Sequence, residues 1–144
     1  MGGSAGGHLA SSLATMYGEQ IYRPDFQILL YPVISMNPRI TNSGTHNQLI
    51  GEHPKPDMEE HYTTSNRVDK NTPRAFIALS SDDTGVPPIN SLLYFEALRK
   101  YNVPATLHIY PTGGHGWGFK DSFAYKKEWT EELAKWLVIG QSYK

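Results

Sequence analysis

The chain has 144 residues, which is long enough for one domain with its own hydrophobic core and too short for two. Hydrophobic residues make up 39% of the chain, which excludes a disordered or fibrous protein, and the formal net charge of −1 gives no electrostatic reason to expect nucleic acid or an anionic membrane as a partner. No apolar run approaches the roughly 20 residues of a membrane-spanning helix, and the absence of cysteine excludes disulfides and thiolate metal sites. The cellular compartment stays open.

Small residues fill much of the first predicted helix, "AGGHLASSLATMYGE", over residues 5–19. Leu9, Leu13 and Met16 follow one another at helical spacing on one side of it, and small residues occupy the other side. Small side chains let a helix pack closely against a sheet, so we expect that side to meet one. The next stretch, "DFQILLYPV", is a short continuous apolar run and predicts a strand covered on both faces, as in a parallel sheet.

A long polar segment, residues 34–71, follows this strand and is called the excursion below. One short helix is predicted within it over residues 55–62, because Pro56 suits a first helical turn and acidic residues lie near the positive end. So long a connection inside a compact domain is typical either of a lid or substrate wall at an active site or of a plain surface loop. The sequence leaves both interpretations open.

Strands and helices alternate over the rest of the chain. Strands are predicted in "RAFIALSS" and "ATLHIYP", and helices in "PPINSLLYFEALRKY" and "AYKKEWTEELAKWLVIG". The residues expected on the inner faces of these two helices are Leu92, Phe95 and Leu98 on the first and Trp129, Leu133, Trp136 and Leu137 on the second. Glu131 is expected to pair with Lys135, and Gly140 to end the last helix. This alternation predicts an α/β protein with a parallel sheet.

Chemically suitable residues fall at three places where a helix begins or a strand ends. Ser4 occupies the centre of "GGSAG", which fits the G-x-S-x-G pattern of a nucleophile elbow. Asp82 and Asp83 follow one predicted strand, and His115 follows the next, between glycines. Sites in parallel α/β folds form at the carboxyl ends of the strands, and Ser, Asp, His is the chain order of α/β-hydrolase triads.

Each of these residue types has a role in nucleophilic catalysis. A serine hydroxyl is a weak nucleophile until a base takes its proton, and a carboxylate must orient the imidazole that does so. The N–H of Ala5, at the start of the first helix, can point at an oxyanion. Asp83, which stands in a D-x-x-V-P context, is the predicted partner of His115, and Asp82 is expected to cap a turn or bind backbone amides.

The motifs "GGSAGGHLAS", "DDTGVP" and "VPATLHIYPTGGHGWGF" resemble those of the esterase/lipase branch of the α/β-hydrolase superfamily, and among these the bacterial acetyl-xylan-esterase-like proteins, often labelled xylanases. The resemblance implies Ser4 as nucleophile, His115 as general base and acid, Asp83 as its partner and Ala5 as one oxyanion donor. It also implies a serine esterase that removes short acyl groups, acetyl above all, from plant polysaccharide or small esters through an acyl-enzyme, with no cofactor.

The sequence departs from this family upstream of Ser4. Members of the family have further strands there and an HGGG-type loop that gives a second oxyanion N–H, and neither precedes Ser4 in this sequence. We therefore expect residues 1–144 to form the C-terminal part of a single α/β-hydrolase domain, a partial fold whose N-terminal strands, including the one before the elbow, are missing. A sheet of three strands would leave an apolar edge at "FQILLYP", through which copies of the chain can associate.

Other functions remain open from the sequence. A dienelactone-hydrolase-like or prolyl-peptidase-like hydrolase shares the D-x-x-V-P and glycine-flanked histidine patterns. An inactive fragment, or one that acts only as an association partner, is the alternative of another class.

Two aromatic side chains near the predicted site have open roles. His8, one helical turn beyond Ser4, is expected to anchor the elbow by a hydrogen bond. Trp117 can stack on a sugar ring of the substrate or merely cover the histidine loop. The remaining histidines predict no zinc site, because those in the excursion lack metal-ligand spacing and that in the last strand is expected to be packed or hydrogen-bonded: His46, His53, His61 and His108.

Overall fold

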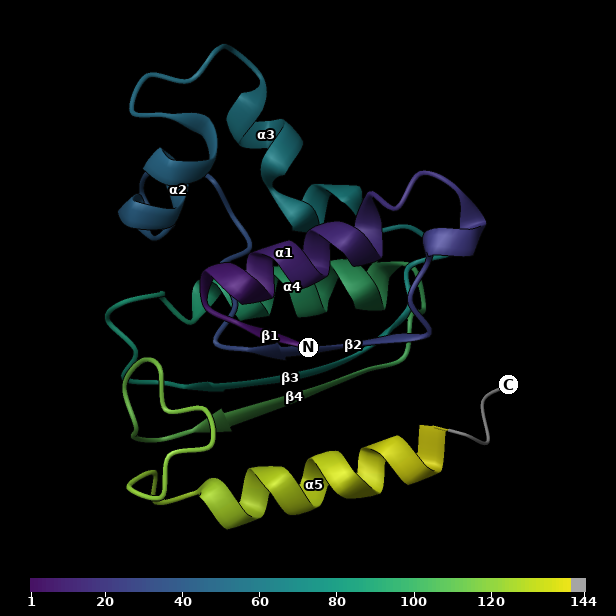
Figure 1. The fold of residues 1–144 in the computed structure, drawn as a ribbon, viewed down its shortest axis with the longest axis vertical. Coiled ribbons are helices and arrows are strands. Elements are labelled where there is room, and N and C mark those ends of the chain that lie inside the picture. The colour runs from purple at the N-terminus through teal and green to yellow at the C-terminus, as the bar shows by residue number, and fades with distance from the viewer. Residues whose placement is uncertain (141–144) are drawn as a thin grey trace.

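A parallel sheet forms the centre of the computed structural model, which describes residues 1–140 (Figure 1). Its strands follow one another in chain order: β1 (Gly2–Gly3), β2 (Phe26–Leu30), β3 (Arg74–Ser80) and β4 (Ala105–Tyr110). Helices α1 (Ala5–Thr15) and α4 (Ile89–Lys100) cover one face, and α5 (Lys126–Ile139) covers the other. The predicted α/β class is confirmed. No helix within residues 1–140 is long and apolar enough to cross a membrane.

The two central strands are apolar along most of their length because helices cover both of their faces. Leu29 pairs with Ile77, and Ile77 with Leu107 on the following strand. Leu29 and Ile77 are fully buried. The continuous apolar runs that predicted these strands thus reflect burial on two faces, as expected for a parallel sheet.

The sheet has one strand more than the sequence predicted. Gly2 pairs with Leu29 and Gly3 with Leu30, so a short strand does lead into the elbow. It covers only the carboxyl end of β2, and Phe26 at the other end of that strand is 40% exposed. Gly2 must be glycine, since a Cβ there would lie 2.0 Å from the carbonyl oxygen of Gly6 on α1. The expectation of three strands was wrong because two glycines carry no apolar pattern.

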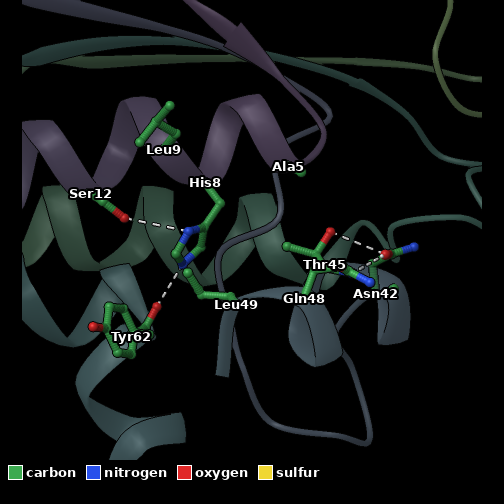
Figure 2. A pocket seen from close by; sticks show the side chains of 10 residues that line it. Ala5, His8, Leu9, Ser12, Asn42, Thr45, Gln48, Leu49 and Tyr62 are labelled. Carbon is green, nitrogen blue, oxygen red and sulfur yellow. Dashed lines mark hydrogen bonds between the residues drawn. The ribbon is translucent and has the colours of Figure 1, made fainter. Parts of the chain in front are cut away.

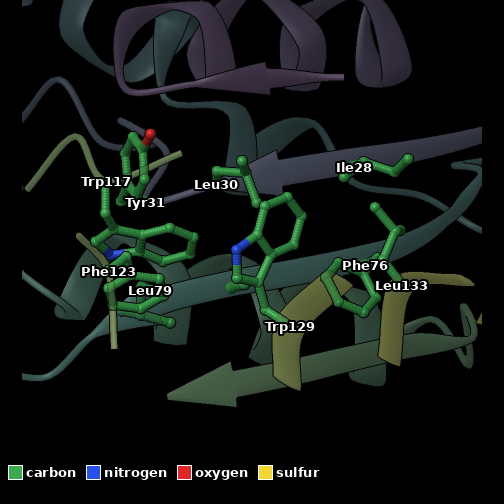
Figure 3. Close-up of a cluster of buried hydrophobic side chains, with 10 residues drawn as sticks. Ile28, Leu30, Tyr31, Phe76, Leu79, Trp117, Phe123, Trp129 and Leu133 are labelled. Carbon is green, nitrogen blue, oxygen red and sulfur yellow. The ribbon is translucent and has the colours of Figure 1, made fainter. Parts of the chain in front are cut away.

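Two apolar clusters fill the layers on either side of the sheet. Figure 3 shows the one under α5, in which Trp129 and Leu133 of the helix meet side chains of β2 and β3. Trp136, also predicted to face inward, is partly buried and lies edge-on to Phe76, with ring centroids 5.8 Å apart. The predicted Glu131–Lys135 pair is wrong, because each side chain has another partner: Lys135 lies 3.0 Å from Glu132, and Glu131 lies 3.9 Å from Lys127.

On the opposite face, α1 packs through its small side as predicted. Gly7, Ser11 and Ala14 are buried, whereas Leu9 and Leu13 are 73% and 50% exposed. This close packing places the N-terminus of α1 directly over the end of the sheet.

The buried face of α4 differs from the prediction. Leu92 is 41% exposed, and Tyr94 and Asn90 are buried in its place. Both buried groups are hydrogen-bonded: the Tyr94 hydroxyl donates to the side-chain oxygen of Gln27, and Asn90 Oδ1 accepts from the N–H of Ile34 and of Ser35. The buried face of α4 is partly polar because Asn90 holds the backbone at the start of the excursion through these hydrogen bonds.

The excursion contains two α-helices, α2 (Ser43–Ile50) and α3 (Met58–Tyr62), which lie beyond α1 on the side away from the sheet (Figure 1). Only the second was predicted, with a longer extent. Asn42 caps α2 by accepting from the Thr45 N–H. Two single-turn 3₁₀ helices, Gln20–Tyr22 and Thr64–Arg67, complete the described structure.

Candidate active site

Ser4 lies in the sharp turn between β1 and α1. Its φ of 56° and ψ of −125° are unusual for a residue with a side chain, so the surrounding structure must hold them. The Ser4 N–H donates to the carbonyl of Leu30, and the Ser4 carbonyl accepts from the N–H groups of Gly7, His8 and Val33 at 2.9, 3.2 and 3.1 Å. These backbone hydrogen bonds fix the turn and place Ser4 at the carboxyl end of β1.

His115 connects Ser4 to Asp83. Its Nε2 lies 2.8 Å from Ser4 Oγ, and its Nδ1 lies 2.7 Å from Asp83 Oδ2. A carboxylate can only accept, so Nδ1 carries the hydrogen and Nε2 accepts from the serine hydroxyl. The structure brings these three side chains together from segments separated by 111 and 32 residues.

The Asp83 side chain is completely buried, whereas that of His115 is 28% exposed. A buried carboxylate needs partners for both oxygens. Asp83 Oδ1 accepts from the N–H of Gly85 and of Val86 at 2.8 and 2.9 Å, while Oδ2 faces the imidazole. The carboxylate therefore has one possible orientation, and it sets that of His115.

Asp82 holds the histidine loop, residues 111–120, from outside. Its two carboxylate oxygens accept from the N–H of Gly114 at 2.8 Å and of Gly113 at 3.3 Å. The prediction that Asp82 binds backbone amides is confirmed. Asp83 thus contacts the imidazole of His115, and Asp82 contacts the backbone of the loop that carries it.

Trp117, a residue of the histidine loop, is buried, with 3% of its surface exposed. Its indole stacks on Phe123, with ring centroids 4.1 Å apart and an interplanar angle of 5°, and its Nε1–H donates to Ser80 Oγ. An indole enclosed in this way offers no face to a sugar ring. The predicted substrate-binding role of Trp117 thus conflicts with its burial, which favours the alternative of a residue that supports the loop.

Tyr31 is a neighbour of the site that sequence reasoning missed. Its ring lies edge-on between His115 and Trp117, at centroid distances of 4.8 and 4.9 Å. Burial raises the pKa of its hydroxyl. Its place directly after β2, at the same sheet edge as Asp83, was the available signal.

The N–H of Ala5 remains the predicted oxyanion donor. Ala5 is the first residue of α1, where an N–H has no intrahelical acceptor and lies at the positive end of the helix dipole. The turn at Ser4 thus places the predicted nucleophile and the predicted oxyanion donor on consecutive residues.

His8 connects α1 to the excursion. Its Nε2–H donates to the carbonyl of Tyr62 at 2.7 Å (Figure 2). Ser11 Oγ, one turn further along α1, donates to Thr64 Oγ1 at 3.0 Å. Burial lowers the pKa of His8. The predicted anchoring hydrogen bond exists, but its partner belongs to the excursion, which is thereby attached to the helix that follows Ser4.

An apolar pocket of about 590 Å³ lies between α1 and the excursion (Figure 2). It begins at Ala5, the residue next to Ser4. Its lining residues come from three segments, and they are Ala5, His8, Leu9 and Ser12 of α1, Asn42, Gly44, Thr45, Gln48 and Leu49 around α2, and Tyr62 of α3. The excursion therefore forms one wall of a pocket beside the predicted nucleophile.

The remaining histidines described here contact protein groups. His46 is buried with its Nε2 3.2 Å from Glu59, and His108 packs on the ring of Phe76 at 4.9 Å. Burial also lowers the pKa of His108. Over residues 1–140, no three histidine, aspartate or glutamate side chains gather as a metal site would require.

Comparison with known protein families identifies the family to which the chain belongs. The model of the prolyl oligopeptidase family matches residues 1–139, a range that includes Ser4, Asp83 and His115. The chain belongs to the prolyl oligopeptidase family. Membership gives the geometry at Ser4 a family setting in which a hydrolase is expected, although the family name does not fix the bond that is cleaved.

This member of the family is similar to an acetylxylan esterase from Xylanibacter ruminicola, with 39% identity over 141 residues. The match covers 95% of this chain and 29% of the esterase. Among solved structures it is similar to an acetyl ester-xyloside bifunctional hydrolase from Caldicellulosiruptor lactoaceticus, with 40% identity and a TM-score of 0.88 over 95% of this chain and 54% of that one.

A further solved structure confirms the fold. The α/β hydrolase MGS-M1, from a deep-sea metagenome library, has 28% identity and a TM-score of 0.69, and the match covers 96% of this chain and 52% of that one. The present chain thus has part of the α/β-hydrolase fold and spans about half the length of these two solved relatives. The resemblance inferred from its motifs is confirmed.

Proposed function

We propose that this protein is a serine ester hydrolase that removes acyl groups, acetyl above all, from carbohydrate or small esters. The observation that carries the proposal is the continuous hydrogen-bonded line from Ser4 Oγ through His115 to the buried carboxylate of Asp83, at 2.8 and 2.7 Å. The names of two relatives, an acetylxylan esterase and an acetyl ester-xyloside hydrolase, support acetylated carbohydrate as the substrate class.

Acylation begins when Ser4 Oγ attacks the ester carbonyl carbon and His115 Nε2 takes the hydroxyl proton. The resulting imidazolium is stabilised by Asp83, whose orientation its two backbone donors maintain. The negative charge on the former carbonyl oxygen is met by the N–H of Ala5. When the tetrahedral intermediate collapses, His115 gives its proton to the departing alcohol oxygen and the acyl group stays on Ser4.

Deacylation repeats these steps with water as the nucleophile. His115 Nε2 removes a proton from the water as its oxygen attacks the acyl carbon, and then returns the proton to Ser4 Oγ as the acid leaves. In both half-reactions His115 takes up one proton and releases it again, and Ser4 Oγ is regenerated at the end of the second.

Peptide hydrolysis is a second candidate, because the matching family model is that of the prolyl oligopeptidases. The same triad can acylate with an amine as the leaving group. We therefore suggest assaying the 144-residue chain against acetylated xylan and p-nitrophenyl acetate beside a proline-containing peptide, with Ser4→Ala as the control. Ester hydrolysis that Ser4→Ala abolishes is expected. Peptide cleavage without ester cleavage would overturn the esterase proposal.

Labelling with a fluorophosphonate tests the nucleophile independently of the substrate. We expect one adduct, on Ser4, and none in the Ser4→Ala chain. If the folded chain forms no adduct, Ser4 is not an activated nucleophile and the alternative of an inert chain or association partner is favoured.

A further inference from the structure

The Tyr31 side chain lies beside His115, and the mechanism above gives it no role. We propose that Tyr31 is a positioning residue, whose ring holds the imidazole of His115 in line with Ser4 Oγ. This inference rests on the proposed ester hydrolysis at Ser4 and adds to it a residue that acts through His115.

The backbone of Tyr31 has a conformation that bulky residues rarely adopt. Its φ is 37°, in the left-handed region. Pro32 follows it, and a proline restricts the residue before it mainly to extended conformations. The Tyr31 N–H donates to the carbonyl of Ala78 at 2.7 Å, which helps to fix this turn. Backbone strain of this kind persists only where the surrounding structure maintains it, and it is concentrated at functional sites.

The residues with the same kind of strain include the predicted nucleophile. Over residues 1–140, the residues other than glycine that have a positive φ are Ser4, Tyr31, Asp57 and Asn102. Aspartate and asparagine tolerate this region, whereas serine and tyrosine do so less readily. Ser4 Oγ lies 2.8 Å from His115 Nε2, and the Tyr31 ring centroid lies 4.8 Å from that of the imidazole. The two unusual conformations thus belong to two residues that contact His115.

The Tyr31 ring lies between the imidazole and a fixed indole. Its ring centroid is 4.8 Å from that of His115 and 4.9 Å from that of Trp117, at interplanar angles of 65° and 78°. Such edge-on arrangements are favourable between aromatic rings. Figure 3 shows Tyr31 against Trp117, which stacks on Phe123 and donates from Nε1 to Ser80 Oγ. Tyr31 thus connects the imidazole to a buried, hydrogen-bonded cluster.

The other contacts of the imidazole leave Tyr31 a defined part in holding it. Nδ1 faces Asp83, and Nε2 faces Ser4. The backbone of Gly85 lies against the start of the side chain, because a Cβ added there would lie 3.1 Å from His115 Cγ. The His115 side chain is nevertheless 28% exposed, so water can reach it. The contact with Tyr31 can be removed by mutation without changing either hydrogen-bonding partner of the imidazole.

Tyr31 also packs against the strand that leads to Ser4. A Cβ added to Gly3 would lie 3.0 Å from Tyr31 Cε2 and 3.3 Å from its hydroxyl oxygen. A Cβ added to Gly118, in the histidine loop, would lie 3.4 Å from the same oxygen. One side chain therefore contacts both the segment that carries Ser4 and the loop that carries His115. Its size helps to set the separation of the two.

The expected consequence of removing the ring is a change in kcat and not in KM. Tyr31 is 8% exposed, so it offers little surface to a substrate. Without its ring, the imidazole of His115 can turn away from Ser4, and a misplacement of about 1 Å lowers the rate by about 10²-fold. The contact with His115 is made by the ring, so phenylalanine retains it and leucine does not.

The kinetic test is hydrolysis of p-nitrophenyl acetate by the 144-residue chain and three variants. Tyr31→Leu should lower kcat by about 10²-fold and change KM by less than about twofold. Tyr31→Phe should retain kcat within about threefold. Tyr110→Leu is the matched control, because Tyr110 also contacts Trp117, at 6.3 Å, while its other ring contacts are with Phe123 and Tyr125. It should retain kcat within about threefold.

Two kinetic outcomes would overturn the proposal. A loss of kcat in Tyr31→Phe as large as in Tyr31→Leu would show that the hydroxyl is required and not the ring. An equal loss in Tyr110→Leu would show that the effect is a general loss of packing. Circular dichroism checks the fold of each variant. If Tyr31→Leu does not fold, Gly3→Ala replaces it, since its Cβ displaces the Tyr31 ring without removing it. An unchanged kcat in Gly3→Ala would then overturn the proposal.

A spectroscopic measurement separates this inference from the proposed function. The hydrogen on His115 Nδ1, bonded to Asp83 Oδ2, gives a proton NMR signal whose observation needs no substrate. We expect this signal in the unmodified chain and in Tyr31→Phe, and we expect exchange with water to broaden it in Tyr31→Leu. Broadening in Tyr31→Leu without any ester hydrolysis by the unmodified chain would contradict the esterase and retain the role of Tyr31. Ester hydrolysis at full rate in Tyr31→Leu, with the signal unchanged, would retain the esterase and overturn the role of Tyr31.

Discussion

The histidine loop and the excursion both lie near Ser4, but carboxylates position the first, whereas hydrogen bonds between neutral groups attach the second to α1 and to Gly85. Two adjacent carboxylates position the histidine loop, Asp83 at the imidazole and Asp82 at the backbone of Gly113 and Gly114. Hydrogen bonds to ionised groups are shorter and stronger than neutral ones. The loop that carries His115 therefore has the stronger restraints.

The contacts that attach the excursion to α1 and to Gly85 are hydrogen bonds between neutral groups. His8 binds the Tyr62 carbonyl, Ser11 binds Thr64, and Asn42 reaches Gly85. None of these contacts touches Ser4 Oγ or His115 directly. We infer that changes in the histidine loop act on the chemical step, whereas changes in the excursion act on the pocket and on stability.

The largest expected effect follows from Asp83→Asn. The amide retains an acceptor for Gly85 and Val86, but it can turn its NH₂ toward His115 Nδ1 and stabilise the tautomer in which Nε2 carries the hydrogen. Nε2 then cannot accept the proton of Ser4, and kcat should fall by about 10⁴-fold. The measurement is steady-state hydrolysis of p-nitrophenyl acetate, with the circular dichroism spectrum unchanged. A loss smaller than about tenfold would show that Asp83 does not orient the base.

A smaller effect is expected from Asp82→Ala. It removes both acceptors for the amides of the histidine loop at a solvent-exposed position, so the loop samples orientations in which His115 is displaced from Ser4. Charge-assisted hydrogen bonds of this kind contribute about 1.5 kcal/mol, and kcat should fall by roughly tenfold.

The separation of kcat from KM makes Asp82→Ala informative about the comparison. KM should change by less than about twofold, because the Asp82 carboxylate acts on the backbone of the histidine loop, through Gly113 and Gly114. Asp82→Asn, which can still accept one of the two hydrogen bonds, should retain most of the activity. An increase in KM with kcat unchanged would assign the histidine loop to substrate binding and remove the distinction between the two segments.

The sequence predicted which three side chains the structure brings together, because each of them is marked by its local context. The glycine pattern around Ser4, the D-x-x-V-P context of Asp83 and the glycines around His115 are all local signals, and the topology of a parallel sheet brings strand ends together. The contacts of Asp82 with backbone amides were also expected, because an aspartate directly after a strand commonly caps a turn or binds backbone N–H groups.

Features that depend on tertiary contacts were not predicted. β1 consists of two glycines and has no apolar pattern, so only its pairing with β2 identifies it. The inner face of α4 is partly polar because Asn90 binds the excursion, which no periodicity of leucines reveals. The burial of Trp117 depends on Phe123 and Ser80, and its spacing from His115 was equally compatible with an exposed indole.

The smallest expected effect concerns His8, which attaches the excursion to α1. It is measured as the pH dependence of the free energy of unfolding. Burial places the pKa of His8 in the folded protein below its ordinary value of 6.5, so the unfolded chain binds more protons in this range. The contribution of neutral His8 to the free energy of unfolding is therefore complete above pH 6.5, and it decreases as the pH falls from 6.5 toward the lower folded-state pKa.

The matched variant is His8→Gln, whose amide can still donate to the Tyr62 carbonyl but does not titrate in this range. Urea unfolding of both proteins between pH 5 and 7.5 should give a shallower pH dependence for His8→Gln, with stabilities at pH 7.5 within about 1 kcal/mol of each other. His108 titrates in the same direction and remains in both proteins, so some slope should persist in the variant. Equal slopes would show that the contact between α1 and the excursion opens before His8 is protonated, and that the neutral restraints are weaker than the structure indicates.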